Sequence, residues 1–175
     1  SKQNARTHKR TIVNTDPDII VRLYKTLVRP HVEYCTAAWS PYYQKDKDLI
    51  EKIQHRFTKM IPNISHLSYE ERIEILHLWT LEVRRNRADL IQVFKMYSGA
   101  SAPGFGDFFE VDSRGRTRGH SLKLVKHRSS TLVRQMFFSE RVVNNWNRLS
   151  AETVASTSLE QFKNRLSKLR EAKKG

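Results

Sequence analysis

The sequence contains a single cysteine, Cys35, among its 175 residues. One cysteine excludes an internal disulfide and a zinc ribbon or knuckle, and it indicates a reducing environment. The sequence also lacks a run of about 18 apolar residues, so it predicts no membrane span, and it shows no secretory leader. We therefore expect an intracellular protein, cytoplasmic or nuclear, that is neither secreted nor held in a membrane.

Motifs for catalysis and metal binding are missing as well. The sequence has no adjacent aspartate pair, no HExxH motif and no glycine-rich phosphate loop. His31 and Cys35 are four residues apart, but they lack a third orienting group, and their position favours core packing over a nucleophilic pair. On its own residues the chain is predicted to be no enzyme and to bind no metal or cofactor.

Acidic residues are few compared with basic ones. The chain has 32 lysines and arginines against 18 aspartates and glutamates, which gives a net charge of +14. An excess of this size repels itself unless a polyanion covers the surface, so nucleic acid is the expected partner. The alternative at this level is a helical protein that is merely basic. Apolar residues make up 38% of the chain, enough for a folded core beneath a large solvated face.

The segment 23–39 is predicted to organise the first half of the chain. Its apolar residues occur at helical spacing on two adjoining sides, which predicts a helix covered by other helices and kinked at Pro30. Asp16 and Pro17 predict the start of this helical region. A second helix is expected from Asp46 or Asp48 to Ile61, with an apolar face that includes Leu49, Ile50, Ile53, Phe57, Met60 and Ile61.

Two further helices are predicted before Gly99. Ser68 and Glu71 match a capping box that opens a short helix. A longer helix is expected over 81–98, with three arginines in its first two turns. Cations there oppose the helix dipole, which favours a binding role over a structural one.

The character of the sequence changes after Gly99. A linker-like loop over 100–106 precedes two short strand candidates, 108–111 and 120–126, which predict one β-hairpin. Helices are expected over 137–149 and from Ser158 onward, with Phe138 and Trp146 in the core rather than stacked on bases. We predict a mainly α fold with three parts: a basic extension over 1–15, a helical domain over 16–99, and a small α+β module over 105–175 that ends in an amphipathic helix.

Basic residues are concentrated in the second module. Residues 112–148 contain nine lysines and arginines but only two acids. Arginines bind phosphates through two parallel hydrogen bonds, and glycines beside them allow close approach of the backbone. The predicted nucleic-acid contacts are Lys25, Arg29, Arg56, Lys59, Arg84, Arg85, Arg87, Arg114, Arg116, Arg118, His120, Lys123, Lys126 and Arg134.

Several strings in the chain resemble one family. They are LYKTLVRPHVEYCTAAWSP, DLIEKIQHRFTKMIP, LSYEERIEIL, DLIQVFKM, TRGHSLKLVK, FFSERVVNNWNRL and SLEQFKNRL. In this order they resemble the C-terminal part of endonuclease–reverse transcriptase polyproteins from non-LTR retrotransposons (LINE elements) of the jockey and chicken-repeat type. The resemblance runs from about Lys9 to the end of the chain.

The resemblance implies that the first helices form the thumb of an RNA-directed DNA polymerase and that the rest is a C-terminal extension. Arg29, Arg56 and Lys59 would grip the template–product duplex, and the turn at 116–120 would hold template RNA or target DNA. The family's catalytic aspartates have no matching positions here, so Mg²⁺ is expected only in the parent polymerase. The chain reads as a piece of that longer protein.

These lines converge on a nucleic-acid-binding fragment of a reverse transcriptase that lacks the catalytic palm. Its expected partners are RNA, an RNA–DNA hybrid or DNA, and the parent palm when both are made in one chain. Two alternatives remain open. The chain could be a protein–protein or self-association module that uses its last helix and Trp146. It could also be a translated relic without function, since Ser150 replaces the proline that usually follows Leu149 in the family.

Overall fold

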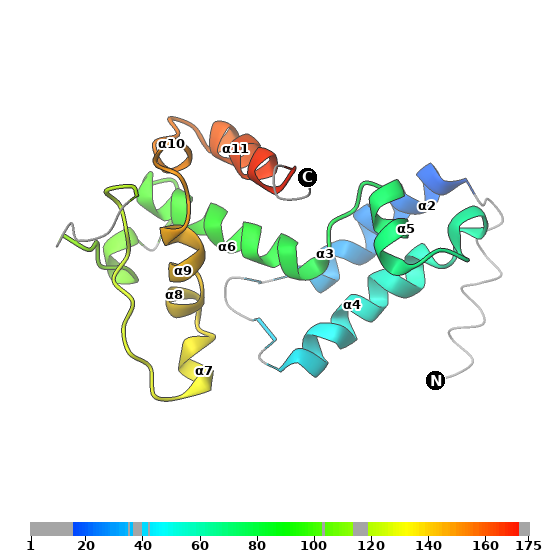
Figure 1. Ribbon diagram of the computed structural model, residues 1–175, viewed down its shortest axis with the longest axis horizontal. Coiled ribbons are helices and arrows are strands. Elements are labelled where there is room, and N and C mark those ends of the chain that lie inside the picture. Colours follow the sequence, from blue (N-terminus) through cyan, green and yellow to red (C-terminus); the bar gives the residue numbers. More distant parts are fainter. Residues whose placement is uncertain are drawn as a thin grey trace. The chain divides into compact units, whose positions relative to one another are not determined.

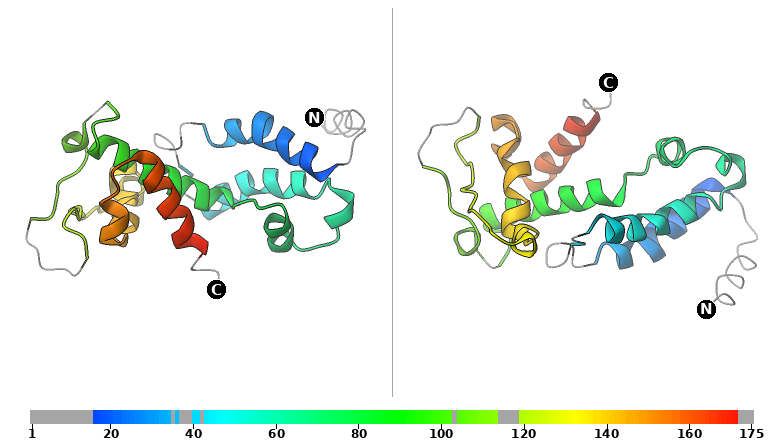
Figure 2. Two further views of the ribbon diagram at one scale, coloured as in Figure 1. Left: turned by 90° about the horizontal axis from the view of Figure 1, so that it is seen from above. Right: turned by 60° about the horizontal axis from the view of Figure 1, so that its bottom comes forward.

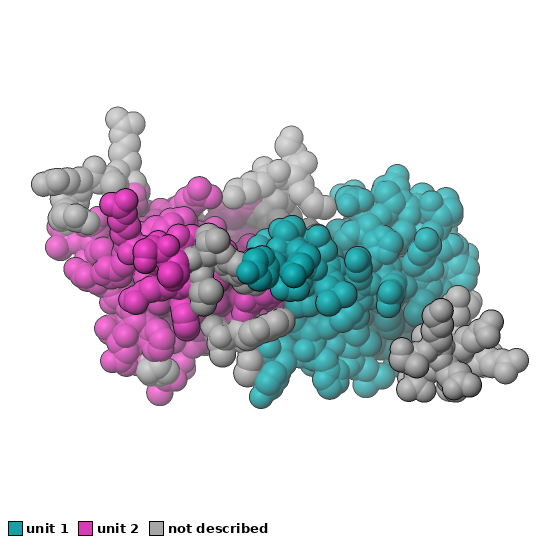
Figure 3. All heavy atoms as spheres, turned by 90° about the horizontal axis from the view of Figure 1, so that it is seen from below, with its two compact units in different colours: residues 1–34, 43–82 teal, residues 35–42, 83–175 magenta. Residues whose placement is uncertain are grey.

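The computed structural model describes residues 16–34, 36, 40–41, 43–102, 104–113 and 119–171, which are mainly helical, as predicted (Figure 1). The chain divides into two compact units, one made of residues 1–34 and 43–82 and the other of 35–42 and 83–175 (Figure 3). This division differs from the predicted boundary between Gly99 and Phe105. Most of helix α6 (Leu81–Tyr97) belongs to unit 2, because its apolar face lies in the core of that unit.

The first helical region begins as the sequence predicts. Asp16 caps helix α2 (Pro17–Leu23) by accepting a 2.9 Å hydrogen bond from the backbone N–H of Asp18. A π-helical turn, η1 (Tyr24–Val28), follows, and α3 (Arg29–Val32) continues it. Pro30 cannot donate a backbone hydrogen bond, and the wider π turn accommodates it without ending the helix. The helical backbone thus passes through Pro30 but ends at Val32; residues 35 and 37–39 of the predicted helix lie outside the described part.

Only one side of this helical region is buried. Ile20 and Tyr24 are covered, whereas Leu27 is 61% and Tyr34 is 77% exposed. The prediction that both apolar sides are covered is therefore wrong for these two residues. The apolar spacing identified a helix correctly, but it could not tell which of the two sides meets the rest of unit 1.

Helix α4 (Gln44–Thr58) buries a partly polar face. Its start lies just after Tyr43, earlier than the predicted Asp46 or Asp48. Gln54 and Thr58 are buried, while the predicted core residues Leu49 and Ile53 are 62% and 41% exposed. The predicted face is wrong for Leu49 and Ile53, because polar partners elsewhere in unit 1 draw the Gln54 side of α4 inward, whereas Ile61 is buried as predicted.

Those partners form one hydrogen-bonded network in unit 1. Gln54 accepts from the hydroxyl of Tyr24 at 2.7 Å, and it donates to the Tyr69 hydroxyl at 2.8 Å and to the Trp79 carbonyl at 3.0 Å. Tyr69 in turn donates to Glu51, and the other carboxylate oxygen of Glu51 accepts from the backbone N–H of Leu81 at 2.9 Å. The network thereby satisfies the first backbone donor of α6.

Helix α5 (Tyr69–Ile75) has the predicted capping box. The backbone N–H of Glu71 donates to the Ser68 hydroxyl at 3.3 Å, and the backbone N–H of Ser68 donates to the Glu71 carboxylate at 2.8 Å. Hydrogen bonding of the Glu71 carboxylate to the side chain and to the backbone N–H of Ser68 holds the pKa of Glu71 below its ordinary value. The four-residue sequence pattern therefore gave this helix start correctly.

The core of unit 2 joins α6 to α8 (Phe138–Arg141), α9 (Val143–Asn147) and α11 (Leu159–Glu171). Phe94 of α6 stacks on Phe162 of α11 with ring centroids 4.3 Å apart, and Trp146 of α9 is fully buried beside them. Phe138 and Trp146 are buried, as predicted, and so is Phe162 on the inward face of the last, amphipathic helix. Figure 2 shows α11 and the α8–α9 segment lying against α6.

The predicted β-hairpin does not appear as strands in the described residues. Its two segments meet at one isolated antiparallel bridge, Val111 with Leu124. Side chains of α9 take the place of a longer ladder. The Asn147 side chain accepts from the Leu124 N–H at 2.8 Å and donates to the Leu124 carbonyl at 2.9 Å. The Trp146 indole donates to the Leu122 carbonyl at 2.8 Å. Helix side chains therefore hold this segment together with the two backbone hydrogen bonds that flank the bridge, from the Asp112 N–H to the Lys123 carbonyl at 2.7 Å and from the Val125 N–H to the Glu110 carbonyl at 2.8 Å.

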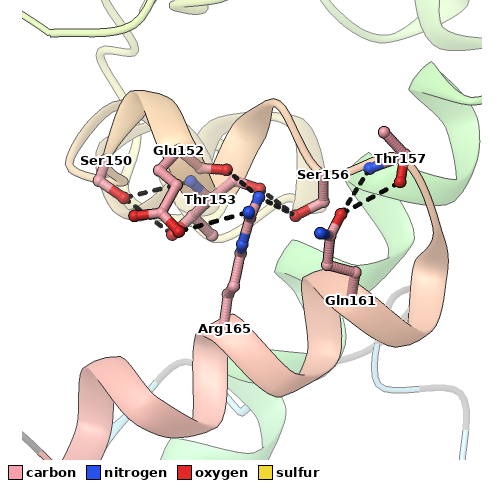
Figure 4. Close-up of polar contacts among 7 residues, drawn as sticks. All are labelled: Ser150, Glu152, Thr153, Ser156, Thr157, Gln161 and Arg165. Atoms are coloured by element: carbon pink, nitrogen blue, oxygen red, sulfur yellow. Dashed lines mark hydrogen bonds and ion pairs between the residues drawn. The ribbon is translucent and has the colours of Figure 1, made fainter.

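Two short helices, α7 (Leu132–Gln135) and α10 (Ala151–Val154), and the 3₁₀ turn η3 (Phe105–Asp107) complete unit 2. Unit 1 has one 3₁₀ turn among its described residues, η2 (Pro62–Ile64). Arg165 of α11 reaches back to α10 (Figure 4). It donates to the Glu152 carbonyl and to the Ser156 hydroxyl, and its guanidinium lies 3.3 Å from the Glu152 carboxylate. This arginine thus stabilises the connection between the two helices.

Candidate nucleic-acid interface

The predicted nucleic-acid contacts fall into four groups by their place in the structure. Arg114, Arg116 and Arg118 lie outside the described residues. The exposed group is Arg56, Lys59, Lys126 and Arg134; the half-buried group is Lys25, Arg29, Arg84, Arg87 and Lys123; and the buried pair is Arg85 and His120. Only the exposed and half-buried side chains offer donors to a ligand at the surface.

Two of the three arginines at the start of α6 take part in packing. Arg85 is 7% exposed, and Arg87 donates to the backbone carbonyl of Lys163 in α11 at 3.1 Å. Burial, together with the positive charge of Arg84, lowers the pKa of Arg87. The sequence favours a binding role because three cations oppose the helix dipole, but Arg85 is buried and Arg87 bonds to α11 in the structure.

His120 is part of the core of unit 2. Its Nε2 lies 3.1 Å from the Trp146 carbonyl, and its ring meets the Trp146 ring edge-on with centroids 6.2 Å apart. The side chain is 6% exposed. Burial lowers the pKa of His120, and the charge of Lys123 acts in the same direction. A buried, neutral imidazole in this position holds the segment before Lys123 rather than facing solvent.

Three exposed cations of unit 2 lie on the segment that contains helix α7. Lys126, Arg128 and Arg134 are exposed, and His127 lies between the first two. Glu140 is the one acidic residue of 113–148, and it is 7% exposed. The exposed charged side chains of the described stretch 119–148 are therefore all cations. Lys126 and Arg134 are among the predicted nucleic-acid contacts, whereas Arg128 is not.

Arg141 has an internal role that the sequence did not reveal. Its guanidinium forms a two-point pair with Asp89 of α6 at 2.8 and 2.7 Å, and it also donates to the carbonyls of Met136 and Thr36 at 3.0 and 2.7 Å. Burial raises the pKa of Asp89 even though Arg141 acts to lower it. The pair spans 52 residues of sequence, and no local pattern connects its members.

Unit 1 carries a second set of exposed cations. Lys52, Arg56 and Lys59 follow one another at spacings of four and three residues on α4 and its C-terminal cap, so they share one side of the helix. Arg29 lies 4.0 Å from Glu33 one turn away, a weak surface pair. The structure thus brings together Arg56 and Lys59 within unit 1, and Lys126 and Arg128 within unit 2; Arg134 is exposed on the helix that follows.

No protein-family model, no curated protein and no solved structure matches the chain. Within the described ranges, no group of three histidine, cysteine or acidic side chains could hold a metal ion. No helix among the same residues is long and apolar enough to cross a membrane.

Proposed function

We propose that this chain binds RNA or an RNA–DNA duplex through its phosphates, as the non-catalytic C-terminal part of a non-LTR retrotransposon reverse transcriptase. In this proposal unit 1 corresponds to the polymerase thumb and unit 2 to the extension that follows it. The assignment to that family depends on the sequence resemblance. The binding activity has support of its own in the distribution of charge.

The observation that carries the proposal is that the exposed charged residues of the segment 119–148 are all positive. Its exposed charged residues are Lys126, Arg128, Arg134 and Arg148, and its single acid is buried. Arg141, the remaining arginine, is turned inward toward Asp89. A surface that presents cations without acids between them attracts the phosphate backbone and carries no information about base sequence.

Salt dependence of binding tests the proposal directly. We expect the affinity of the full chain for a single-stranded RNA to fall steeply between about 50 and 200 mM salt in a filter-binding titration. Substituting alanine for Lys126, Arg128 and Arg134 together should weaken binding to all RNA sequences about equally. It should also reduce the slope of log K against log salt by about 2, at roughly 0.7 per lost phosphate contact.

A charge-matched variant controls for the loss of three positive charges. Arg22, Lys45 and Lys168 are exposed and lie outside the predicted set. Substituting alanine for these three should leave the salt slope close to that of the wild type. Equal weakening by both triple variants, or binding that does not respond to salt, would contradict a phosphate-binding surface at this place.

Self-association is a second candidate, supported by exposed apolar residues on α4. Leu49 and Ile53 are 62% and 41% exposed and lie one turn apart. The route through Trp146 loses its support, because that side chain is fully buried and Phe162 of the last helix faces the core. Light scattering coupled to size-exclusion chromatography tests this candidate: a dimer that dissociates when Leu49 and Ile53 become serine, and that ignores RNA, would favour it.

A further inference from the structure

A pocket of about 570 Å³ opens in unit 2 between the extended chain before α7 and the helices α7, α8 and α9. The helices are labelled in Figure 1. The residues around it are largely polar: Lys126, His127, Arg128, Ser129, Gln135, Met136, Glu140, Arg141 and Asn144. Its volume lies within the range of pockets that hold one small ligand, and it is too small for a nucleic-acid duplex.

Two buried polar atoms at this pocket have no hydrogen-bond partner among the described residues. They are Oε2 of Glu140 and the hydroxyl oxygen of Ser129. Glu140 is 7% exposed, and the neighbouring guanidinium of Arg141 directs its donors to Asp89 and to two backbone carbonyls instead. A buried carboxylate oxygen without a donor is unfavourable, so a ligand that brings N–H groups would be bound favourably here.

The mouth of the pocket carries positively charged side chains. Lys126, His127 and Arg128 are exposed along one side, and each can face an anion. The side-chain amides of Gln135 and Asn144 add donors and acceptors on the walls. The pocket therefore combines an acceptor inside with cations outside, and it suits a ligand that joins a group rich in N–H donors to a phosphate.

A nucleotide has this combination, and guanine fits the acceptor best. The Watson–Crick edge of guanine presents N1–H and the N2 amino group side by side, which matches the two oxygens of a carboxylate. Adenine and cytosine place a ring acceptor beside their amino group, and that acceptor would face the second carboxylate oxygen. A glutamate in a pocket can thus distinguish guanine from the other bases through its hydrogen bonds.

We propose that this pocket binds one unpaired guanosine nucleotide of an RNA strand. Glu140 accepts from N1–H and from the N2 amino group, while Lys126 and Arg128 contact the phosphate. The inference rests on the proposed function and deepens it: the exposed cations hold any strand, and the pocket adds a preference for an unpaired guanine.

Mononucleotides test the pocket on the unaltered protein. In isothermal titration or NMR shift mapping with the full chain, we expect GMP to bind about tenfold or more tightly than IMP, which lacks only the N2 amino group. This is the effect of one hydrogen bond to a charged acceptor. AMP should bind more weakly than both. Equal affinities for GMP, IMP and AMP would overturn the proposal without any variant being made.

Two variants identify the residues. Glu140→Gln keeps the size of the side chain but replaces one acceptor oxygen by a donor, and it should remove the preference of GMP over IMP. Glu110→Gln, at an exposed acid outside the pocket, should leave that preference unchanged. A GMP preference that survives Glu140→Gln in a folded variant, as judged by circular dichroism, would count against the carboxylate as the reader.

Failure of this inference can be separated from failure of the proposed function. A chain that binds RNA with a steep salt dependence but treats all mononucleotides alike keeps its phosphate-binding surface and loses the guanine pocket. A chain that prefers GMP over IMP but does not bind RNA strands keeps the pocket as a nucleotide site and loses the proposed function.

Discussion

The two units of this chain place charged groups in their interiors in different ways. In unit 1, Arg72 is 2% exposed and directs its guanidinium to neutral oxygens, the Thr58 hydroxyl at 3.2 Å and the Leu67 carbonyl. In unit 2, Asp89 and Arg141 meet each other directly. The loss of one hydrogen bond to a neutral partner lowers stability only modestly. Removal of one member of a buried ion pair leaves an uncompensated charge and lowers stability much more.

Breaking the ion pair should have the largest effect on stability. We expect Arg141→Met to lower the free energy of unfolding by roughly 3 to 5 kcal/mol, because it leaves the buried Asp89 without its main partner. Urea denaturation measures this change. Adding Asp89→Leu should restore part of the loss, since the uncompensated charge is then gone. The control Arg148→Met alters an exposed arginine and should change stability by less than about 0.5 kcal/mol.

Breaking the hydrogen-bonded network around Gln54 in unit 1 should cost less. Gln54→Leu removes the acceptor of Tyr24 and the donors to Tyr69 and Trp79, and we expect a loss of about 1 to 3 kcal/mol. Gln44→Leu, at the exposed start of the same helix, is the matched control. Hydrogen exchange resolved by peptide sharpens the comparison: Gln54→Leu should raise exchange within 44–81, and Arg141→Met within unit 2. Loss of protection across both units in either variant would mean that the two interiors unfold together.

The smallest expected effect is the part of the pH dependence of stability that comes from His120. Burial places the pKa of His120 below its ordinary value of 6.5, so the folded chain keeps the imidazole neutral where the unfolded chain binds a proton. The free energy of unfolding should therefore fall as pH is lowered from about 7 through 6.5 and below. His120→Gln should flatten this dependence relative to the wild type. His127→Gln, at an exposed histidine, should leave it unchanged.

Local patterns predicted the parts of the fold that local chemistry determines. The caps at Asp16 and Ser68 follow from short-range hydrogen bonds, and the inward faces of Trp146 and Phe162 follow from helical spacing. Neither depends on distant residues. The predicted face of α4 failed at Leu49 and Ile53 because the partners of Gln54 are Tyr24, Tyr69 and Trp79, whose positions no helical period encodes.

The candidate interface was predictable only as a composition. An excess of arginine and lysine in the second half of the chain is visible in the sequence, but burial decides which of them reach a ligand. Arg85 and His120 turn inward, whereas Arg128 stays at the surface. The buried carboxylate of Glu140 could not be anticipated either, because in the sequence it is one acid within an amphipathic helix.

Asn147 has a consequence beyond the fold of unit 2. Its side-chain amide occupies both the donor and the acceptor of Leu124, at 2.8 and 2.9 Å. A short extended segment with open backbone groups is a template on which another chain can add itself, and such edge-to-edge growth leads to aggregation. The amide closes that template at Leu124, so the segment can remain extended without recruiting a neighbour there.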